Sequence, residues 1–203
     1  MFVHLHTHTE YSLLDGMSKI KDLIQAAKQN KQKALAITDH GVMHGTLEFY
    51  FEAKKQGIKP LIGIEAYVAH TSRLNKNTSE RSPYHLTLLA KNNIGYSNLL
   101  KLTTLSHLEG FYYKPRIDRE LLEQYKDGLI VLSGCPSGEL MSGLLSDDIE
   151  KAKETIFWYK ETFGNDYYIE IQEHKQQQFS KLTPSLVSLA RELSVDLVAT
   201  NDS

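Results

Sequence analysis

The chain has 203 residues, of which 41% are hydrophobic and 24% charged, a composition that allows one buried core and excludes a disordered chain. Its formal net charge of -2 provides no overall attraction to nucleic acid, so any DNA affinity has to come from a local site. The single cysteine, Cys135, excludes an intrachain disulfide framework, and without a signal peptide or a membrane-length apolar run we expect a cytoplasmic protein with no membrane partner.

Seven short apolar segments are predicted to be strands, and amphipathic helices separate most of them. The predicted strands are 2–5, 34–38, 60–68, 84–89, 129–132, 167–171 and 195–199. One predicted helix begins at Ser18 and has an apolar face formed by Ile20, Leu23, Ile24 and Ala27. A second ends at Gly57 and is marked by Leu47, Tyr50, Phe51 and Lys54. Four more are predicted at about 94–106, 117–126, 137–163 and 177–193. The polar segment 71–83 is predicted to be an exposed, mobile loop.

Continuous apolar strands alternating with helices indicate parallel strands that are covered on both faces, hence an α/β fold. An open sheet would place its site at one switch point, whereas a barrel collects residues from the ends of many strands. The distribution of candidate ligands favours a distorted (β/α)7 barrel of seven strands, formed by a single domain over 1–203. The last apolar run, 195–199, has no helix after it, so we expect the barrel to be truncated at its C-terminal end.

Three histidines alternate near the start of the chain, at His4, His6 and His8. In a strand, alternate side chains point to the same face, so these imidazoles could converge on one metal ion. A histidine-rich start can also be a purification tag or a solvated tail. A tag is usually an unbroken run, however, and here Leu5 and Thr7 interrupt the histidines.

Residue types that bind metals recur at or just after the ends of the predicted strands. They are His6, His8, Asp39, His40, Glu65, Cys135, His174 and Asp202. Asp15, in the first loop, and His85, near the start of its strand, fit this arrangement less well. Such a set at one end of a barrel predicts a mixed nitrogen, oxygen and thiolate site with too many ligands for one ion.

Several of these residues also have a structural explanation. Asp39 could cap the segment that follows it, with Gly41 supplying a positive φ in a turn. Cys135 could be a small buried apolar residue, and His174 a surface histidine. Glu65 is harder to explain in this way, because a carboxylate within an apolar strand is costly unless it is paired or bound to metal. His44, His70 and His107 are interpreted as surface or packing residues.

The same residues carry a family resemblance. Four segments resemble the successive motifs of the polymerase and histidinol phosphatase (PHP) superfamily: His6-Thr7-His8-Thr9, Ile37-Thr38-Asp39-His40-Gly41, Gly63-Ile64-Glu65 and Thr200-Asn201-Asp202. Four further segments resemble, more narrowly, the PHP domains at the N-terminus of bacterial DNA polymerase III alpha subunits: 2–16, 85–92, 132–135 and 168–172. The resemblance covers the whole chain.

The resemblance implies a distorted seven-stranded barrel that holds up to three divalent metals, described as zinc, manganese or iron, with nine ligands. Matching the motifs implies eight of them here: His6, His8, Asp15, His40, Glu65, His85, Cys135 and Asp202. Glu65 would bridge two ions, Asp39 would orient His40 from behind, and the expected catalytic set is His6, His8, Asp39, His40, Glu65 and His174. The family pattern closes with Asp-x-His, so the ninth ligand is expected beyond Ser203. His4 stands where many members carry an aspartate, and it is not assigned to the metal.

The family implies a metal-dependent phosphoesterase, which in a polymerase would be a 3′ to 5′ proofreading exonuclease acting on a DNA 3′ end. The parent chain would carry magnesium-dependent nucleotidyl transfer beyond residue 203 and would contact a sliding clamp and a separate proofreading subunit. Two alternatives belong to other classes. One is a non-catalytic, metal-stabilised module that supports the polymerase, and the other is a small-molecule phosphatase like histidinol phosphatase.

Overall fold

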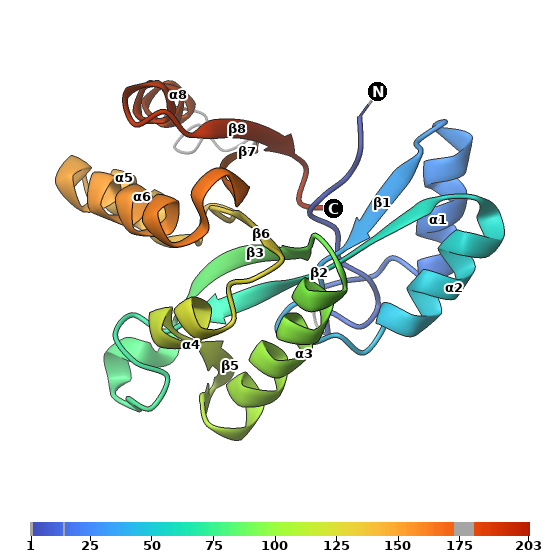
Figure 1. Ribbon diagram of the computed structural model, residues 1–203, viewed down its shortest axis with the longest axis horizontal. Coiled ribbons are helices and arrows are strands. Elements are labelled where there is room, and N and C mark those ends of the chain that lie inside the picture. Colours follow the sequence, from blue (N-terminus) through green and yellow to red (C-terminus); the bar gives the residue numbers. More distant parts are fainter. Residues whose placement is uncertain (1, 14, 173–180) are drawn as a thin grey trace.

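The computed structural model describes residues 2–13, 15–172 and 181–203, which form a curled sheet with helices on its outer side (Figure 1). The strands run in the order β4-β5-β2-β3-β6-β7-β8, and β1 pairs with the first half of β2. The strands are β1 (Ala34–Ile37), β2 (Lys59–Val68), β3 (Tyr84–Ala90), β4 (Phe111–Tyr112), β5 (Lys114–Ile117), β6 (Leu129–Leu132), β7 (Tyr167–Gln172) and β8 (Asp196–Thr200). The predicted α/β class with a curled, barrel-like sheet is therefore confirmed.

The helices are α1 (Ile20–Gln29), α2 (Thr46–Gln56), α3 (Asn93–Leu108), α4 (Arg119–Gln124), α5 (Glu139–Leu145), α6 (Ile149–Phe163) and α8 (Thr183–Glu192), with short 3-10 helices at η1 (Thr78–Arg81) and η2 (Gly164–Asp166). In Figure 1, α1 and α2 lie beside β1, whereas α5, α6 and α8 lie at the opposite end of the sheet. None of the helices in the described ranges is long and apolar enough to cross a membrane.

The N-terminal segment passes between β1 and the C-terminus (Figure 1). Ala36 N donates to His4 O at 2.9 Å and Thr38 N donates to Thr7 O at 2.9 Å, while His8 N donates to the Ser203 carbonyl at 2.6 Å. The prediction of a regular strand at 2–5 is wrong. Between the two hydrogen bonds, the donors are two residues apart, at Ala36 and Thr38, but the acceptors are three apart, at His4 and Thr7, so the segment does not keep a regular strand register with β1. The segment still links β1 to the chain after β8, which places His6 and His8 inside the curve of the sheet.

Strand β3 runs antiparallel to both of its neighbours, β2 and β6. The prediction of uniformly parallel strands is therefore wrong at this strand, although its predicted range of 84–89 is close to the observed one. An apolar run gives no direction, so the sequence pattern could not reveal the reversal. Because of it, the start of β3 lies at the same end of the sheet as the carboxyl ends of its neighbours, and this explains why His85 stands at a strand start.

The helix predictions are confirmed in position and corrected in detail. The single helix predicted at 137–163 is broken into α5 and α6 at Asp147, which has φ +57°, and Asp148 caps α6 through Lys151 N. Leu47 on α2 is 62% exposed, whereas Phe49 carries the buried face. Strands β4 and β5 were not predicted, and the first part of the 177–193 prediction lies outside the described residues.

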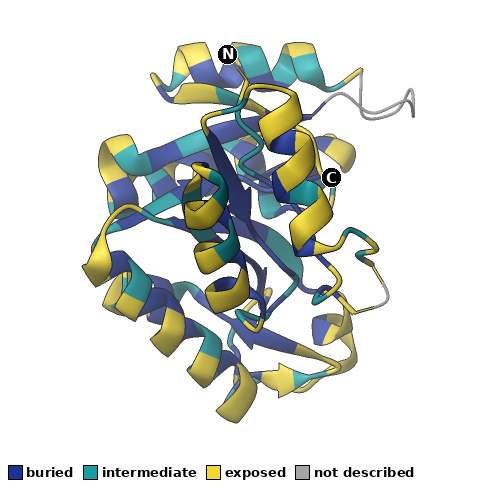
Figure 2. Cartoon of the chain, turned by 90° about the vertical axis from the view of Figure 1, so that its right-hand side faces the viewer, coloured by how far each residue is buried: buried dark blue, intermediate teal, exposed yellow. Residues whose placement is uncertain are grey.

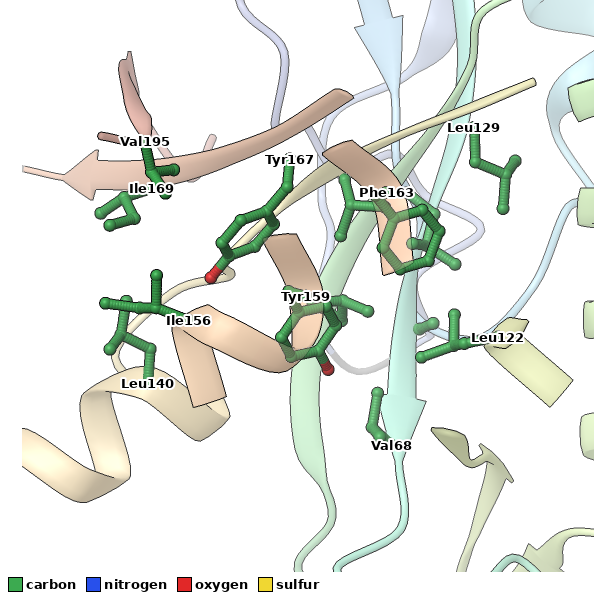
Figure 3. Close-up of a cluster of buried hydrophobic side chains, with 14 of the residues drawn as sticks. Val68, Leu122, Leu129, Leu140, Ile156, Tyr159, Phe163, Tyr167, Ile169 and Val195 are labelled. Atoms are coloured by element: carbon green, nitrogen blue, oxygen red, sulfur yellow. The ribbon is translucent and has the colours of Figure 1, made fainter. Parts of the chain in front are cut away.

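The largest apolar core lies between the sheet and helices α3, α4, α5, α6 and α8. Tyr159 of α6 stacks on Tyr167 of β7 with ring centroids 5.2 Å apart, and Phe163 packs on Tyr159 (Figure 3). A second cluster, which includes Ile24 and Phe49, joins α1 and α2 to β1. Figure 2 shows buried residues along the strands and exposed residues on the outer sides of the helices. The sheet is thus a rigid support for the side chains at its end.

Most of the segment 71–83 is exposed, as predicted, but two of its charged residues, Arg73 and Glu80, are buried. Glu80 in η1 is fully buried, and its carboxylate accepts hydrogen bonds from the backbone N–H groups of His70 and Thr71 at 2.8 and 3.0 Å. Arg116 of β5, also fully buried, lies 3.5 Å from Glu80 and donates to the backbone carbonyls of this segment. Glu80 therefore takes part in a buried network of hydrogen bonds and an ion pair within the protein.

Candidate metal centre

The metal-binding residue types from separate elements meet at one end of the sheet. They are His6 and His8 of the N-terminal segment, His40 after β1, Glu65 within β2, His85 at the start of β3, Cys135 after β6 and Asp202 after β8. The sharp turn after β1 uses Gly41 at φ +63°, as predicted, and a Cβ there would collide with Tyr67 and Pro115.

Glu65 is the centre of the cluster, and its side chain has no exposed surface. Its Oε1 lies 3.2 Å from His6 Nε2 and 3.0 Å from His85 Nδ1. Its Oε2 lies 2.5 Å from His40 Nδ1 and 3.5 Å from His8 Nε2. One carboxylate therefore faces four imidazoles from three different elements, as a bridging ligand would.

Three overlapping sets of ligand atoms lie within 4.8 Å of one another: His6 with His8 and Asp202, His8 with His40 and Glu65, and Glu65 with His85 and Cys135. Asp202 contributes an oxygen 3.2 Å from His8 Nε2. Because the sets share His8 and Glu65, they could hold adjacent ions. The donors are imidazole, carboxylate and thiolate, which suit zinc, manganese or iron.

Four buried polar atoms of this cluster make no hydrogen bond of normal geometry: His6 Nε2, His8 Nε2, His40 Nδ1 and Glu65 Oε2. Each of them lies within ion-pair distance of another potential ligand atom of the cluster. Buried polar atoms are nearly always satisfied, because an unpaired one costs about 1–3 kcal/mol. All four face the centre of the cluster, so bound cations would satisfy them together. The residues present therefore fit a divalent metal group.

Glu170 of β7 contacts the His6 ring at Nδ1, the nitrogen that does not face the cluster. Its Oε1 lies 2.8 Å from His6 Nδ1, and it accepts further hydrogen bonds from the hydroxyls of Thr87 and Thr200. A carboxylate only accepts, so neutral His6 keeps its proton on Nδ1 and leaves the lone pair of Nε2 for the cluster. This is the carboxylate–histidine arrangement that orients metal-binding imidazoles.

Ser12 and Asp39 hold His8 in the same way. The Ser12 hydroxyl donates to Asp39 at 2.8 Å, so it must accept from His8 Nδ1, 2.9 Å away, and from His40 N at 3.1 Å. His8 therefore also presents a bare Nε2 to the cluster. Both Asp39 oxygens are occupied, since Thr9 donates to each of them at 2.7 and 2.8 Å. Asp39 neither faces the cluster nor caps the segment after it, and it acts through Ser12.

The remaining predicted residues are less central. Asp15 lies 3.1 Å from His40 Nε2 but is 80% exposed and belongs to none of the three sets. Cys135 is buried, with its Sγ 3.6 Å from His85 Nδ1. His174 lies outside the described residues. His4 belongs to none of the three ligand sets, and its ring packs edge-on against Phe2.

The charge states are set by competition between burial and pairing. Burial opposes the charged form of Glu65, but hydrogen bonds from the surrounding histidines, His40 first, hold its carboxyl pKa well below the ordinary value. Burial likewise opposes the charged form of His6, and Glu170 followed by Glu65 outweighs it and holds the His6 pKa well above the ordinary value. Burial and then Glu65 raise the pKa of the Cys135 thiol. A cation at this cluster would take the place of the His6 proton and favour the Cys135 thiolate.

Replacing Glu170 by glutamine is expected to weaken metal binding by about 10- to 100-fold, because the carboxylate that fixes the His6 tautomer is lost. The measurement is competition with a chromophoric chelator. Glu150→Gln, an exposed change in the first turn of α6, is the matched control and should bind like the unchanged protein. Equal affinity in the Glu170→Gln variant would show that the Glu170 carboxylate does not support metal binding through His6.

Sequence reasoning missed Glu170 and Ser12 as functional residues. Glu170 had a signal of the kind that singled out Glu65, because it is a carboxylate inside an apolar strand, next to Ile169 and Ile171. Ser12 had none, since a serine in a loop is ordinary and only its contacts reveal its role.

Comparison with known proteins gives one matching family. The model of the PHP domain family matches residues 4–174. The chain is 52% identical over 204 residues to the DNA polymerase III subunit alpha of Borreliella burgdorferi and 45% identical over 210 residues to that of Deinococcus radiodurans. These alignments cover 100% and 99% of this chain but 18% and 16% of the relatives. The chain thus spans less than one fifth of their length.

Solved structures show the same fold at low identity. A Bifidobacterium adolescentis protein assigned to the metal-dependent phosphoesterases superposes with a TM-score of 0.62 at 15% identity, over 98% of this chain and 86% of that one. An amidohydrolase from Chromobacterium violaceum superposes with a TM-score of 0.59 at 14% identity, over the same shares of the two chains.

Proposed function

This chain belongs to the PHP domain family, and we propose that it is the N-terminal PHP domain of a replicative DNA polymerase III alpha subunit, in which it hydrolyses phosphodiester bonds with divalent metal ions. Its substrate is the 3′ end of DNA, and the reaction is a 3′ to 5′ exonuclease step. The protein acts in the cytoplasm, and the single free Cys135 suits a reducing compartment.

One observation carries the proposal: four buried atoms of His6, His8, His40 and Glu65 make no hydrogen bond of normal geometry and lie beside other potential ligand atoms. Ion pairing between His40 Nδ1 and Glu65 Oε2 accounts for part of this cluster, whereas bound divalent ions would satisfy all four atoms. We assign as ligands His6, His8, His40, Glu65, His85, Cys135 and Asp202, with Asp15 at the exposed side of His40. Zinc, manganese and iron all suit this donor set.

The chain's own residues prepare the reaction. Glu170 and Ser12 fix the protons of His6 and His8 on Nδ1, so that both Nε2 atoms stay available. Adjacent divalent ions, when bound, clamp a phosphate, stabilise the leaving oxygen and lower the pKa of a bound water so that it attacks at neutral pH. The exposed carboxylate of Asp15 lies at the open side of the cluster, where a water proton could be accepted.

In the parent polymerase, nucleotidyl transfer would use magnesium in other domains, and a sliding clamp and a proofreading subunit would be partners. The similarity to alpha subunits supports these assignments. The domain itself would then correct or trim the primer that the polymerase extends.

The test combines metal analysis with a primer assay. The purified protein is expected to carry more than one equivalent of divalent ion, and with manganese it should shorten a labelled primer from a mismatched 3′ end. A primer labelled at its 5′ end distinguishes removal from the 3′ end from cleavage elsewhere.

Chelation should abolish the shortening, and manganese should restore it. Folded, metal-loaded protein that leaves the primer intact would contradict the nuclease proposal and support a metal-stabilised scaffold. Hydrolysis of histidinol phosphate but not of DNA would identify a small-molecule phosphatase instead.

A further inference from the structure

A cavity of about 650 Å³ adjoins the metal cluster on the side of β5 and η1. We call it the Lys114 cavity, after the β5 lysine at its rim. It shares His85 and Ser137 with a second cavity of about 650 Å³ that contains His8, His40 and Asp202. A ligand whose reacting group lies at the cluster could therefore continue into the Lys114 cavity.

The Lys114 cavity is locally basic in a protein of net charge -2. Arg81 and Lys114 line it, and no aspartate or glutamate does. Among the described residues neither cation has a carboxylate within ion-pair distance, and each lies over an aromatic ring instead: Lys114 Nζ is 5.1 Å from the Tyr67 ring and the Arg81 guanidinium is 4.9 Å from the Tyr113 ring. Both charges remain available to an anionic ligand.

Aromatic rings connect the cations to the cluster. The Tyr67 ring lies 5.9 Å from the His40 ring and 5.1 Å from the His85 ring, so a single side chain separates Lys114 from two proposed ligands. On another part of the wall, His70 stacks on Tyr84 with centroids 4.2 Å apart and an interplanar angle of 24°. Tyr67 is buried, so a base could stack only on the His70–Tyr84 pair. Flat rings near unpaired cations suit single-stranded nucleic acid, because bases stack on the rings and phosphates meet the cations.

We propose that the Lys114 cavity is a subsite for single-stranded DNA, which binds the phosphodiester and base next to the 3′-terminal nucleotide at the cluster. This inference rests on the proposed function for its catalytic consequence, although the binding it predicts requires no hydrolysis. The subsite selects a strand over an isolated phosphate ester, since only a strand places a second phosphate near Lys114 and Arg81. It also supplies the local site that DNA affinity requires in an acidic protein.

The test measures binding of a labelled oligothymidylate by fluorescence anisotropy, in chelator and at several salt concentrations. For single strands, each phosphate contact contributes about 0.7 to the slope of log affinity against log salt. Lys114→Ala and Arg81→Ala are each expected to weaken binding and to lower the slope by about 0.7. Lys114→Arg should retain the slope, because it keeps the positive charge.

Lys126→Ala is the matched control, since Lys126 is an exposed lysine that precedes β6, at the opposite end of that strand from the cluster. Both cavity residues are exposed, so their variants should melt at the same temperature as the control. Unchanged slopes in both variants, the same change in Lys126→Ala, or equal competition by thymidine monophosphate and by the oligonucleotide would overturn the subsite.

A kinetic arm separates this inference from the proposed function. Lys114→Ala should raise KM for the oligonucleotide in manganese, while hydrolysis of bis(p-nitrophenyl) phosphate, which has no second phosphate, stays unchanged. Lys114-dependent DNA binding without any hydrolysis would contradict the phosphoesterase proposal and leave the subsite standing. DNA hydrolysis with the same kinetics in the Lys114→Ala and Arg81→Ala variants would support the phosphoesterase proposal and contradict the subsite.

Discussion

Replacing Glu65 by glutamine is expected to remove metal binding and phosphoesterase activity together while the chain stays folded. Glu65 is the carboxylate shared by two of the three ligand sets, and its two oxygens face four imidazoles. Glutamine keeps the shape but supplies one weak oxygen ligand and an amide that repels a cation. The loss should exceed the roughly 10- to 100-fold cost of changing a residue behind the ligands.

The fold should survive because the partners of Glu65 are histidines. An imidazole titrates near neutral pH, so His6 and His40 can release their protons when the carboxylate is lost and need not remain as unpaired charges. The measurements are bound metal per chain, the rate of 3′ shortening in manganese, and the melting temperature with and without chelator. Glu161→Gln, an exposed change on α6, is the matched control.

Two outcomes would contradict this account of Glu65. Retained nuclease activity in a Glu65→Gln protein would place the reaction elsewhere in the chain. A lower melting temperature in metal, in a protein with no nuclease activity to lose, would mean that the cluster serves stability alone.

The cluster could be predicted largely from sequence because its members follow strands, and strand ends are visible as the ends of apolar runs. His40 follows β1, Cys135 follows β6 and Asp202 follows β8, so their common location needed only the assumption of a curled sheet. Glu65 was identified because burying a carboxylate in an apolar strand costs free energy unless the carboxylate is paired or bound to metal.

What the sequence could not predict depends on direction and on contacts. The reversal of β3 moves His85 to the cluster end, and apolar runs have no direction. Ser12 owes its role to one hydroxyl that donates to Asp39 and accepts from His8 and His40, and the spacing of residues in the sequence does not reveal such contacts. The break at Asp147 needed a positive φ that helical periodicity does not indicate.

The burial of Glu80 in the segment before β3 was not predicted, because its partner comes from a later strand. The polar composition predicted solvent exposure, which holds for most of the segment, but the Glu80 carboxylate pairs with an arginine 36 positions further along the chain. Buried ion pairs of this kind join segments that local patterns treat separately, so their presence can be inferred only from the folded chain.

Arg116→Met is therefore expected to destabilise the protein by about 3–5 kcal/mol, the usual cost of removing one partner of a buried ion pair. The guanidinium is fully buried and donates to the carbonyls of Gly110, Asn75 and Arg73 at 3.0, 2.9 and 2.8 Å. Methionine fills much of the volume but leaves those carbonyls unsatisfied and Glu80 without its cation. Urea unfolding measures the loss.

Arg119→Met is the matched control, because Arg119 is 41% exposed in its pair with Glu139 and such pairs contribute about 0–1 kcal/mol. In the double variant Arg116→Met with Glu80→Gln, the destabilisation should be smaller than the sum of the two single changes, since the second change removes the unpaired charge. Additive losses would show that the two side chains do not interact. Because η1 also carries Arg81 to the Lys114 cavity, Arg116→Met should weaken oligonucleotide binding at temperatures where the protein is still folded, and Arg119→Met should not.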